Sequence, residues 1–208
     1  FCLILTGNRS IFMRKDKSSG DEITLSAKVL DEILEWAESF VFAVFVVVLI
    51  FIFLFRIVLV EGPSMNSTLS DGDRLIISHL NYKPQRGDIV VLNSTGLNKT
   101  IIKRCIGVGG DTVRIDYSDS SVTVNGEKLD ESYIDERMKV QPMFDQDYYK
   151  DGTVYEYNIP EGKIFVLGDN RNHSTDSRSY FVGLVDESDV LGKAVFRLLP
   201  FGSFGKIG

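Results

Sequence analysis

Apolar residues are concentrated in one stretch near the N-terminus of this 208-residue chain. Phe40–Phe55 is an unbroken apolar run, and after the single Arg56 it resumes and continues to Val60. At about 1.5 Å per residue, residues 40–60 span roughly 30 Å as a helix, which is the thickness of the hydrocarbon core of a bilayer. The pattern predicts a transmembrane helix over residues 36–60.

A second pattern precedes this run. Between Ile23 and Glu38, apolar residues recur at helical spacing with acidic residues between them, which predicts an interfacial helix that leads into the span. These apolar residues are Leu30, Ile33, Leu34 and Ala37. A cleavable signal peptide is the alternative, but the run is longer than a signal h-region and residues 59–63 form a poor small-x-small cleavage site.

Basic residues before the span favour a cytoplasmic N-terminus by the positive-inside rule. They are Arg14, Lys15, Lys17 and Lys28. We expect residues 1–35 to form a cytoplasmic segment and residues 61–208 to form one domain outside the cytoplasm. Met13 opens a polar stretch and is a candidate start, so residues 1–12 are left out of the expected fold.

Beyond Glu61, short segments rich in β-branched and aromatic residues alternate with turn signals. No amphipathic helix of about 10 to 15 residues separates them, which favours a mainly β, antiparallel fold over a parallel α/β fold. We predict that Asp130–Gly152, which is acidic and rich in Tyr and Gln, is an excursion from the sheet. The predicted strands are Arg74–Ser78, Asp88–Leu92, Thr100–Val108, Thr112–Asp116, Ser121–Val124, Tyr155–Ile159, Lys163–Leu167 and Lys193–Leu198.

Composition and charge exclude several classes of protein. The net charge of -6 argues against nucleic acid as the principal partner. Cys2 and Cys105 lie on opposite sides of the predicted span, which excludes a disulfide scaffold. The chain has no Cys/His cluster of the zinc-ribbon kind.

Ser64 follows the predicted span within the sequence Glu61-Gly62-Pro63-Ser64-Met65. One interpretation is that Ser and Gly only turn the chain as it leaves the membrane. A catalytic interpretation requires a base, because a serine hydroxyl is a weak nucleophile until its proton is removed. The candidate bases are Lys103, His79 and His173.

Lys103 lies in a predicted strand, where it shares a face with Ile101, Cys105 and Gly107. An ammonium group among apolar side chains is poorly solvated, which lowers its pKa and leaves more neutral amine to act as a base. The alternative is an edge-strand lysine that discourages aggregation. The pattern permits both interpretations.

The segment Gly168–Arg178 is rich in polar side chains and follows a predicted strand. It is either a solvated loop or a hydrogen-bonded cluster. In a cluster, Ser174 would orient a catalytic amine, and Asp169, Asp176 and Arg178 would hold the loop rigid. His173 with Asp169 or Asp176 would be a rival Ser-His-Asp triad on Ser64.

Taken together, these segments resemble the bacterial type I signal peptidases, which are membrane-bound serine proteases with a Ser-Lys dyad. The resemblance covers the chain from the span to the C-terminus, and its motifs occur in the family's order. The matching blocks are Gly62-Pro63-Ser64-Met65 with Thr68-Leu69, Arg86-Gly87-Asp88-Ile89-Val90, Lys103-Arg104-Cys105-Ile106-Gly107 with Gly110-Asp111, and Gly168-Asp169-Asn170-Arg171 with Ser174, Asp176, Ser177 and Arg178.

The resemblance implies a role for each matching residue. Ser64 would be the nucleophile, Lys103 the general base, and Ser174 the serine that hydrogen-bonds the lysine. The oxyanion hole would use the Ser64 backbone N–H and a second, backbone donor near Gly62. The supporting residues would be Asp169, Asp176, Arg178 and Arg104, and the pair Lys103-Arg104 matches the bacterial form rather than the histidine form. Ser67 and Gly109 depart from the family, which often has proline at both positions.

The implied activity is the removal of signal peptides from secretory preproteins at the outer membrane surface, through an acyl-enzyme and without metal or other cofactor. The expected partners are preproteins with small residues before the cut and membrane lipid, with no nucleic acid. Two alternatives remain: a self-cleaving Ser-Lys peptidase of the repressor-processing type, and a catalytically silent, membrane-tethered β domain that binds peptides.

Overall fold

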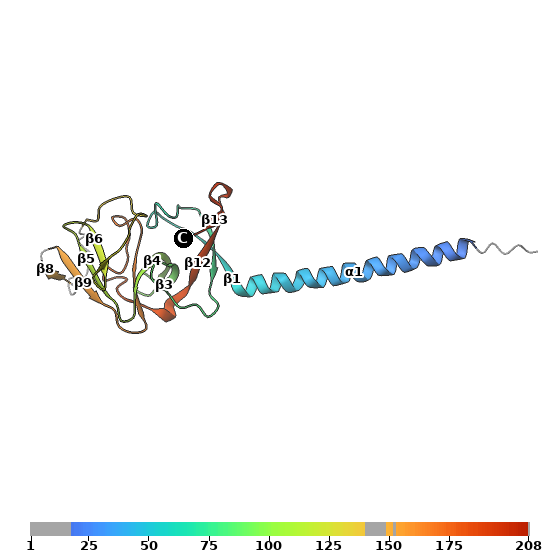
Figure 1. Ribbon diagram of the computed structural model, residues 1–208, viewed down its shortest axis with the longest axis horizontal. Coiled ribbons are helices and arrows are strands. Elements are labelled where there is room, and N and C mark those ends of the chain that lie inside the picture. Colours follow the sequence, from blue (N-terminus) through green and yellow to red (C-terminus); the bar gives the residue numbers. More distant parts are fainter. Residues whose placement is uncertain (1–17, 140–148, 152, 208) are drawn as a thin grey trace, which may run out of the picture. The chain divides into compact units, whose positions relative to one another are not determined.

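The computed structural model describes residues 18–139, 149–151 and 153–207, so residues 1–12 and Met13 lie outside the described part of the chain. The chain divides into two compact units, Phe1–Ile50 and Phe51–Gly208. Helix α1 spans Ser18–Leu54 and accounts for the described part of the first unit (Figure 1).

Helix α1 contains a stretch, Val29–Ile52, that is long and apolar enough to cross a membrane, and none of it is buried in the protein. Its large apolar side chains are exposed, including Phe40, Phe45 and Phe51. From Phe40 to Leu54 the helix is apolar on every side, and such a helix needs apolar surroundings on every side. The helix therefore fits a bilayer by its length and its composition.

The predicted transmembrane helix is wrong at its C-terminal end. The helix ends at Leu54, and Phe55–Leu59 forms strand β1, which pairs antiparallel with β2 (Arg74–Ser78) in the register Phe55↔Ser78 to Leu59↔Arg74. A continuous apolar run is compatible with either a helix or a strand, so its pattern could not locate this boundary. The predicted interfacial helix over residues 23–38 is part of α1 and continuous with the apolar stretch.

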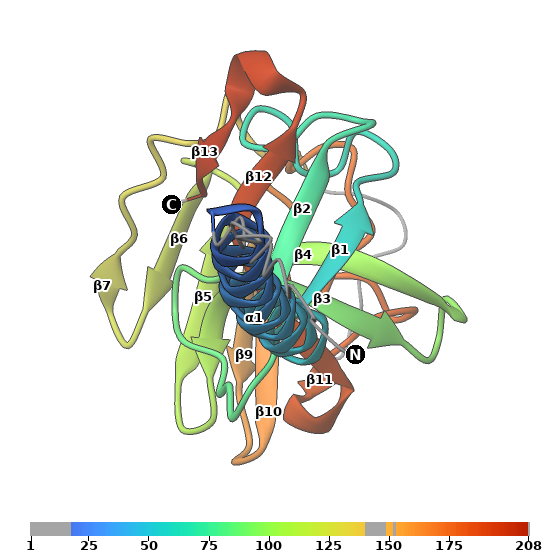
Figure 2. The ribbon, with the colours of Figure 1, turned by 90° about the vertical axis from the view of Figure 1, so that its right-hand side faces the viewer.

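The second unit contains two antiparallel sheets (Figure 2). The larger has the order β1-β2-β12-β3-β4-β10-β11, with β13 paired to β12, and the smaller has the order β7-β6-β5-β9-β8. The remaining strands of the larger sheet are β3 (Ile89–Ser94), β4 (Lys99–Val108), β10 (Lys163–Leu167), β11 (Val185–Asp186), β12 (Val190–Leu199) and β13 (Gly205–Lys206). Those of the smaller sheet are β5 (Thr112–Asp116), β6 (Ser121–Val124), β7 (Glu127–Lys128), β8 (Tyr149–Asp151) and β9 (Val154–Asn158).

The mainly β, antiparallel fold predicted from the sequence is confirmed. All eight predicted strands are present, and four have the predicted bounds: β2, β5, β6 and β10. Strands β1, β7, β8, β11 and β13 were missed, because most are only two or three residues long. Short 3-10 helices at Glu187–Asp189 and Phe201–Ser203 flank β12.

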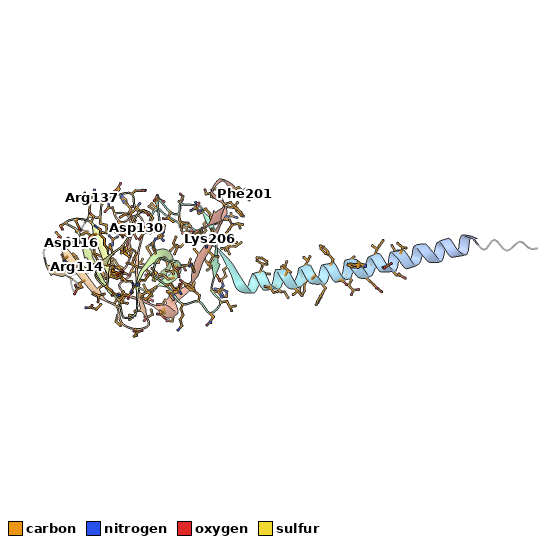
Figure 3. The ribbon with its side chains drawn as sticks, in the orientation of Figure 1. Arg114, Asp116, Asp130, Arg137, Phe201 and Lys206 are labelled. Atoms are coloured by element: carbon orange, nitrogen blue, oxygen red, sulfur yellow. The ribbon has the colours of Figure 1, made fainter. Side chains whose placement is uncertain are left out.

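The smaller sheet packs against Ile106, Phe165 and Leu167 of β4 and β10, so the two sheets share one core, and the larger sheet has a further core of its own. Val113, Ile115 and Tyr157 are among the buried residues of the smaller sheet, and Leu75, Ile77 and Val91 belong to a core in the larger one. Figure 3 shows the two regions of the second unit, with Arg114 and Asp116 of β5 at one end and Phe201 and Lys206 at the other.

The predicted excursion Asp130–Gly152 is only partly correct. Residues 130–139 contain no strand, but Met138 is buried in the core of the smaller sheet. Tyr149–Asp151 forms β8 and pairs with β9, so the segment returns to that sheet. Residues 140–148 lie outside the described residues.

The core of the larger sheet generates the first prediction. Leu75 is fully buried in it, so Leu75→Ala should lower the free energy of unfolding by about 2–5 kcal/mol, through lost burial and the cavity left behind. Chemical denaturation in detergent, followed by near-UV circular dichroism, measures this change. The matched control is Leu80→Ala, because Leu80 is exposed and its truncation should change stability by no more than about 0.5 kcal/mol. Equal effects of the two variants would contradict the described packing.

Candidate active site

Ser64 lies in the segment between β1 and β2, and neighbouring apolar residues fix its position. Met65 and Leu69 are buried in the core of the larger sheet, and the Leu69 N–H donates to the Met65 carbonyl over 2.8 Å to close a helical turn. Because both ends of this turn are anchored in the core, the backbone of Ser64 is held at the surface of the sheet.

Lys103 approaches this serine from β4, where its backbone pairs with Val90 of β3 and lies just beyond the part of β4 that pairs with β10. Its side chain is only 3% exposed, so the interpretation as a solvent-exposed lysine that discourages aggregation is wrong. The Lys103 side chain is buried, and its Nζ is hydrogen-bonded to Ser64 Oγ over 2.8 Å and to the Ile102 carbonyl over 2.8 Å. The structure thus brings together the serine and the lysine singled out by their sequence motifs.

The environment of Lys103 favours its neutral form. Burial is the largest cause and lowers the pKa of Lys103 to about 8, while the carboxylates of Asp176 and Asp169 act in the opposite direction. The cations Lys99 and Arg178 lower the pKa further. Ile101 and Cys105, the neighbours on the same face of β4, are buried in one apolar cluster, as the alternation along the strand predicted.

Two cavities adjoin the Ser64–Lys103 pair. One of about 240 Å³ is lined by Ser64, Lys103, His173 and Thr175, among others. The second, of about 470 Å³, is lined by Arg56–Leu59 and by residues of β4, and it shares Glu61, Lys99 and Thr100 with the first. The shared lining residues make the two cavities neighbouring parts of one depression.

A buried ion pair supports the backbone next to Ser64. Arg104 Nε and Nη2 donate to the two carboxylate oxygens of Asp169 over 2.9 and 2.7 Å. The hydroxyl of Thr68 donates to the same carboxylate over 2.5 Å. This arrangement joins β4, the Ser64 segment and the loop after β10, as expected if Asp169 and Arg104 are supporting residues.

Asn170 was not singled out as a site residue, yet it contacts the Ser64 segment directly. Its backbone N–H donates to the Ser64 carbonyl and its Nδ2 to the Pro63 carbonyl, each over 3.1 Å. Its place in the matching block Gly168-Asp169-Asn170-Arg171 was the available signal, but a sequence does not show which loop residues reach a neighbouring loop.

Asp176 and Arg178 form a second buried pair. Arg178 Nε and Nη2 donate to Asp176 Oδ1 and Oδ2 over 2.8 and 2.9 Å, and the Gly168 N–H donates to Asp176 Oδ2 over 3.0 Å. Despite its burial, the pKa of Asp176 is lowered, because the Arg178 charge and these hydrogen bonds outweigh desolvation. The pair holds the loop after β10 against the backbone of Gly168.

Ser174 is beside the site, but it does not make the expected bond. Its buried hydroxyl makes no hydrogen bond of normal geometry with the described residues, although it is near enough to Asp176 to help lower the pKa of that carboxyl, whereas Lys103 Nζ contacts Ser64 and Ile102. A Cβ added at Gly168 would lie 2.2 Å from Ser174 Oγ. The absence of a side chain at Gly168 therefore makes room for this hydroxyl.

Gly62 also differs from its expected role. Its backbone adopts a φ of 82°, which favours glycine, and its N–H donates to Asp71 Oδ1 over 2.7 Å. This donor is therefore already engaged in the structure and is not free for an oxyanion.

The rival Ser-His-Asp triad is not assembled in the structure. His173 lines the cavity, but the hydrogen bond described for Ser64 Oγ is with Lys103. Asp169 and Asp176 are each paired with an arginine. His79 follows β2 and is not among the residues that line this cavity.

The chain is similar to known proteins along most of its length. Residues 33–199 match the family described as "Signal peptidase, peptidase S26", and the chain belongs to this family. It is 39% identical to signal peptidase I of Bacillus licheniformis over 85% of this chain and 94% of that protein. It is 38% identical to signal peptidase I T of Bacillus subtilis (strain 168) over 91% of this chain and 96% of that protein. A crystal structure of a signal peptidase I from Enterococcus faecalis V583 has 33% identity and a TM-score of 0.41, and it covers 54% of this chain and 97% of its own.

The resemblance inferred from the sequence blocks is thereby confirmed, and with it the assignment of the chain as a peptidase. The self-cleaving repressor-processing type is excluded, since the relatives match along most of their own length and are signal peptidases.

The Asp176–Arg178 pair generates the second prediction. Asp176→Asn leaves a buried guanidinium without its counter-charge and should destabilise the fold at pH 7 by about 3–5 kcal/mol. The folded pKa of Asp176 lies below its ordinary value of 3.8, so this stabilisation is present above pH 3.8 and is lost as the pH falls through the folded pKa. Denaturation of both proteins at several pH values should show their stabilities converging only in acid. Asp186→Asn, in an exposed pair with Lys163, is the control and should change stability little. A pH-independent difference would contradict the assignment.

Proposed function

We propose that Ser64 and Lys103 form the Ser-Lys dyad with which this signal peptidase removes signal peptides from secretory preproteins. The observation that supports this proposal best is the 2.8 Å contact between Ser64 Oγ and the Nζ of a buried lysine. A serine nucleophile needs a base within hydrogen-bond reach, and an amine serves as a base at neutral pH only when its pKa is depressed.

The reaction follows from this pair. Ser64 Oγ attacks the scissile carbonyl carbon while its proton moves to Lys103 Nζ. Collapse of the tetrahedral intermediate breaks the C–N bond, and Nζ returns the proton to the leaving amine. Water then attacks the acyl-enzyme ester with Lys103 again as the base, which releases the signal peptide's carboxylate and restores Ser64.

Oxyanion stabilisation would come chiefly from the Ser64 backbone N–H. Because the Gly62 N–H donates to Asp71, the hydrogen bond that Gly62 was expected to supply would require this contact to break. One oxyanion-hole donor contributes about 3 kcal/mol to transition-state stabilisation. The backbone position of Ser64, held by Asn170, would therefore affect the rate as well as its hydroxyl.

The substrate would bind as an extended strand between β1 and the first half of β4. Among the described strands, β10 pairs with β4 only from Arg104 to Val108, which leaves the β10 side of residues 99–103 without a strand partner. The 470 Å³ cavity lies along this edge and is lined by Ile102 and Val58, with Ile77 and Val91 also in its wall. An unpaired edge beside an apolar cavity suits β-augmentation by a peptide with small side chains before the cut.

Helix α1 would anchor the enzyme in the membrane, with the N-terminus in the cytoplasm and the peptidase domain outside it. The apolar length of the helix and the basic residues before it support this orientation. We propose a division into a cytoplasmic segment, a single span and a peptidase domain, with membrane lipid as a partner. Anchoring confines the active site to the surface at which the apolar part of a signal peptide lies.

The dyad generates the third prediction. Ser64→Ala and Lys103→Met should each lower kcat/KM for a preprotein by at least about a thousandfold, because neither group can be replaced by the remaining one. Cleavage by detergent-solubilised protein, followed by gel electrophoresis, measures the loss. Matched controls are Ser118→Ala and Lys128→Met, whose side chains are exposed in the smaller sheet and which should retain full activity.

His173→Ala tests the rival base in the same assay and should retain most of the activity. Cleavage by Ser64→Ala at the wild-type rate would refute Ser64 as the nucleophile. Loss in His173→Ala with activity in Lys103→Met would make histidine the base.

The pKa of Lys103 generates the fourth prediction. The neutral amine is the active form, so kcat should rise with pH through a value near 8. Lys99 lowers the pKa of Lys103, so Lys99→Gln should raise that pKa and move the acid limb of the pH profile to higher pH. A profile that is flat between pH 6 and 9 would contradict Lys103 as the base.

A further inference from the structure

The segment Glu131–Lys139, here called the strap, has no role assigned by the sequence motifs. It nevertheless contacts Arg104, which follows Lys103, and Ser67, which lies in the same segment as Ser64. The Arg104 guanidinium carbon lies 4.1 Å from the centroid of the Tyr133 ring, and Arg104 directly follows Lys103 in β4. The backbone carbonyl of Tyr133 accepts a 2.9 Å hydrogen bond from Ser67 Oγ in the Ser64 segment.

The contact with Arg104 completes the fixation of that side chain. Its nitrogens donate to Asp169, to the Gly87 carbonyl and to Thr68, so its edges are held by hydrogen bonds. Such bonds lie in the plane of the guanidinium, and the guanidinium carbon lies over the ring of Tyr133. A cation over an aromatic face contributes about 0.5–2 kcal/mol, more when water is excluded.

The strap is itself firmly held to the loop after β10. Glu131 pairs with the buried Arg171 over 2.5 Å, and Arg171 Nε donates to the Gly168 carbonyl over 3.1 Å. Asn172 Nδ2 donates to Glu136 and to the Arg137 carbonyl, and Asn172 Oδ1 accepts from the Lys139 N–H. Met138 is buried in the core of the smaller sheet. These contacts fix Tyr133 relative to three elements: β4, the Ser64 segment and the loop after β10.

We propose that Tyr133 is a positioning residue, whose ring holds Arg104 on Asp169 and whose carbonyl holds the Ser64 segment, so that Ser64 Oγ and Lys103 Nζ stay aligned. The proposal rests on the Ser64–Lys103 mechanism proposed above. Tyr133 touches neither reacting atom, and it acts through Arg104 and Ser67.

The proposal predicts a change in the pKa of Lys103, which a loss of fold stability alone would not cause. The charged groups that act on Lys103 are Asp176, Asp169, Lys99 and Arg178. Asp169 raises the pKa of Lys103, and the bound Arg104 offsets that negative charge. When Arg104 is held less firmly, Asp169 should act more strongly on Lys103, and the acid limb of kcat should move to higher pH.

The test compares Tyr133→Leu, Tyr133→Phe and Val124→Ala in the full-length protein in detergent, with preprotein cleavage measured from pH 6 to 10. Tyr133→Leu should lower kcat by about tenfold to a hundredfold, as expected for a reacting pair displaced by a fraction of an ångström to 1 Å. Its KM should change by less than about threefold, since no substrate contact is removed. The acid limb of its profile of kcat against pH should move to higher pH by about half a unit.

The other two variants are matched controls. Tyr133→Phe retains the ring and the carbonyl, and it should restore kcat and the pH profile. Val124 is buried in the smaller sheet, so Val124→Ala should lower the melting temperature while leaving the pH profile of kcat in place.

Wild-type kcat and pH profile in a folded Tyr133→Leu would overturn the proposal, and so would an equal shift in Val124→Ala. If Tyr133→Leu does not fold, Ser67→Ala removes the second contact of Tyr133 and should lower kcat with unchanged KM, and unchanged kcat there would equally overturn it. Failure of the dyad itself would appear separately, as activity in Ser64→Ala.

Discussion

The proposed chemistry of this protein depends on one constraint: an amine must be buried close to a serine, with its pKa depressed towards neutrality. Burial of a lysine disfavours its ammonium form, and this effect is the main reason that the pKa of Lys103 falls to about 8. A lysine at an exposed edge would keep a pKa near its ordinary value. The burial of the Lys103 side chain, at the point where the pairing of β4 with β10 ends, is thus a chemical requirement as well as a packing feature.

The other buried charges near Lys103 have to be compatible with this requirement. Asp169 and Asp176 each raise the pKa of the amine, in opposition to the effect of burial. Each is, however, paired with a buried arginine, Arg104 or Arg178, so most of its charge is compensated locally. The two pairs therefore hold the surrounding loops and, at the same time, limit the effect of the carboxylates on the base.

The sequence allowed prediction of the parts that short-range patterns specify. Strand alternation predicted β5 and β10 with their bounds, and the motif blocks around Ser64 and Lys103 predicted a pair that the structure places 2.8 Å apart. The end of the helix was missed because β1 is as apolar as the helix before it and depends on pairing with β2. The contact between Tyr133 and Arg104 was also beyond prediction, since it joins a loop to a distant strand through side-chain geometry.

Lys103 and Arg104 show why two adjacent cations are not interchangeable here. Successive residues of a strand point to opposite faces, so the two side chains reach different neighbours from one point of β4. Arginine stays charged and binds Asp169 through two parallel hydrogen bonds, which a single ammonium cannot reproduce. If a lysine took that place, the carboxylate would be held less firmly. If Lys103, the proposed base, faced Asp169 directly, its pKa would rise and less of the neutral amine would be present. The order Lys103-Arg104 along the strand thus places the amine that can lose its proton on one face of β4 and the guanidinium that stays charged on the other.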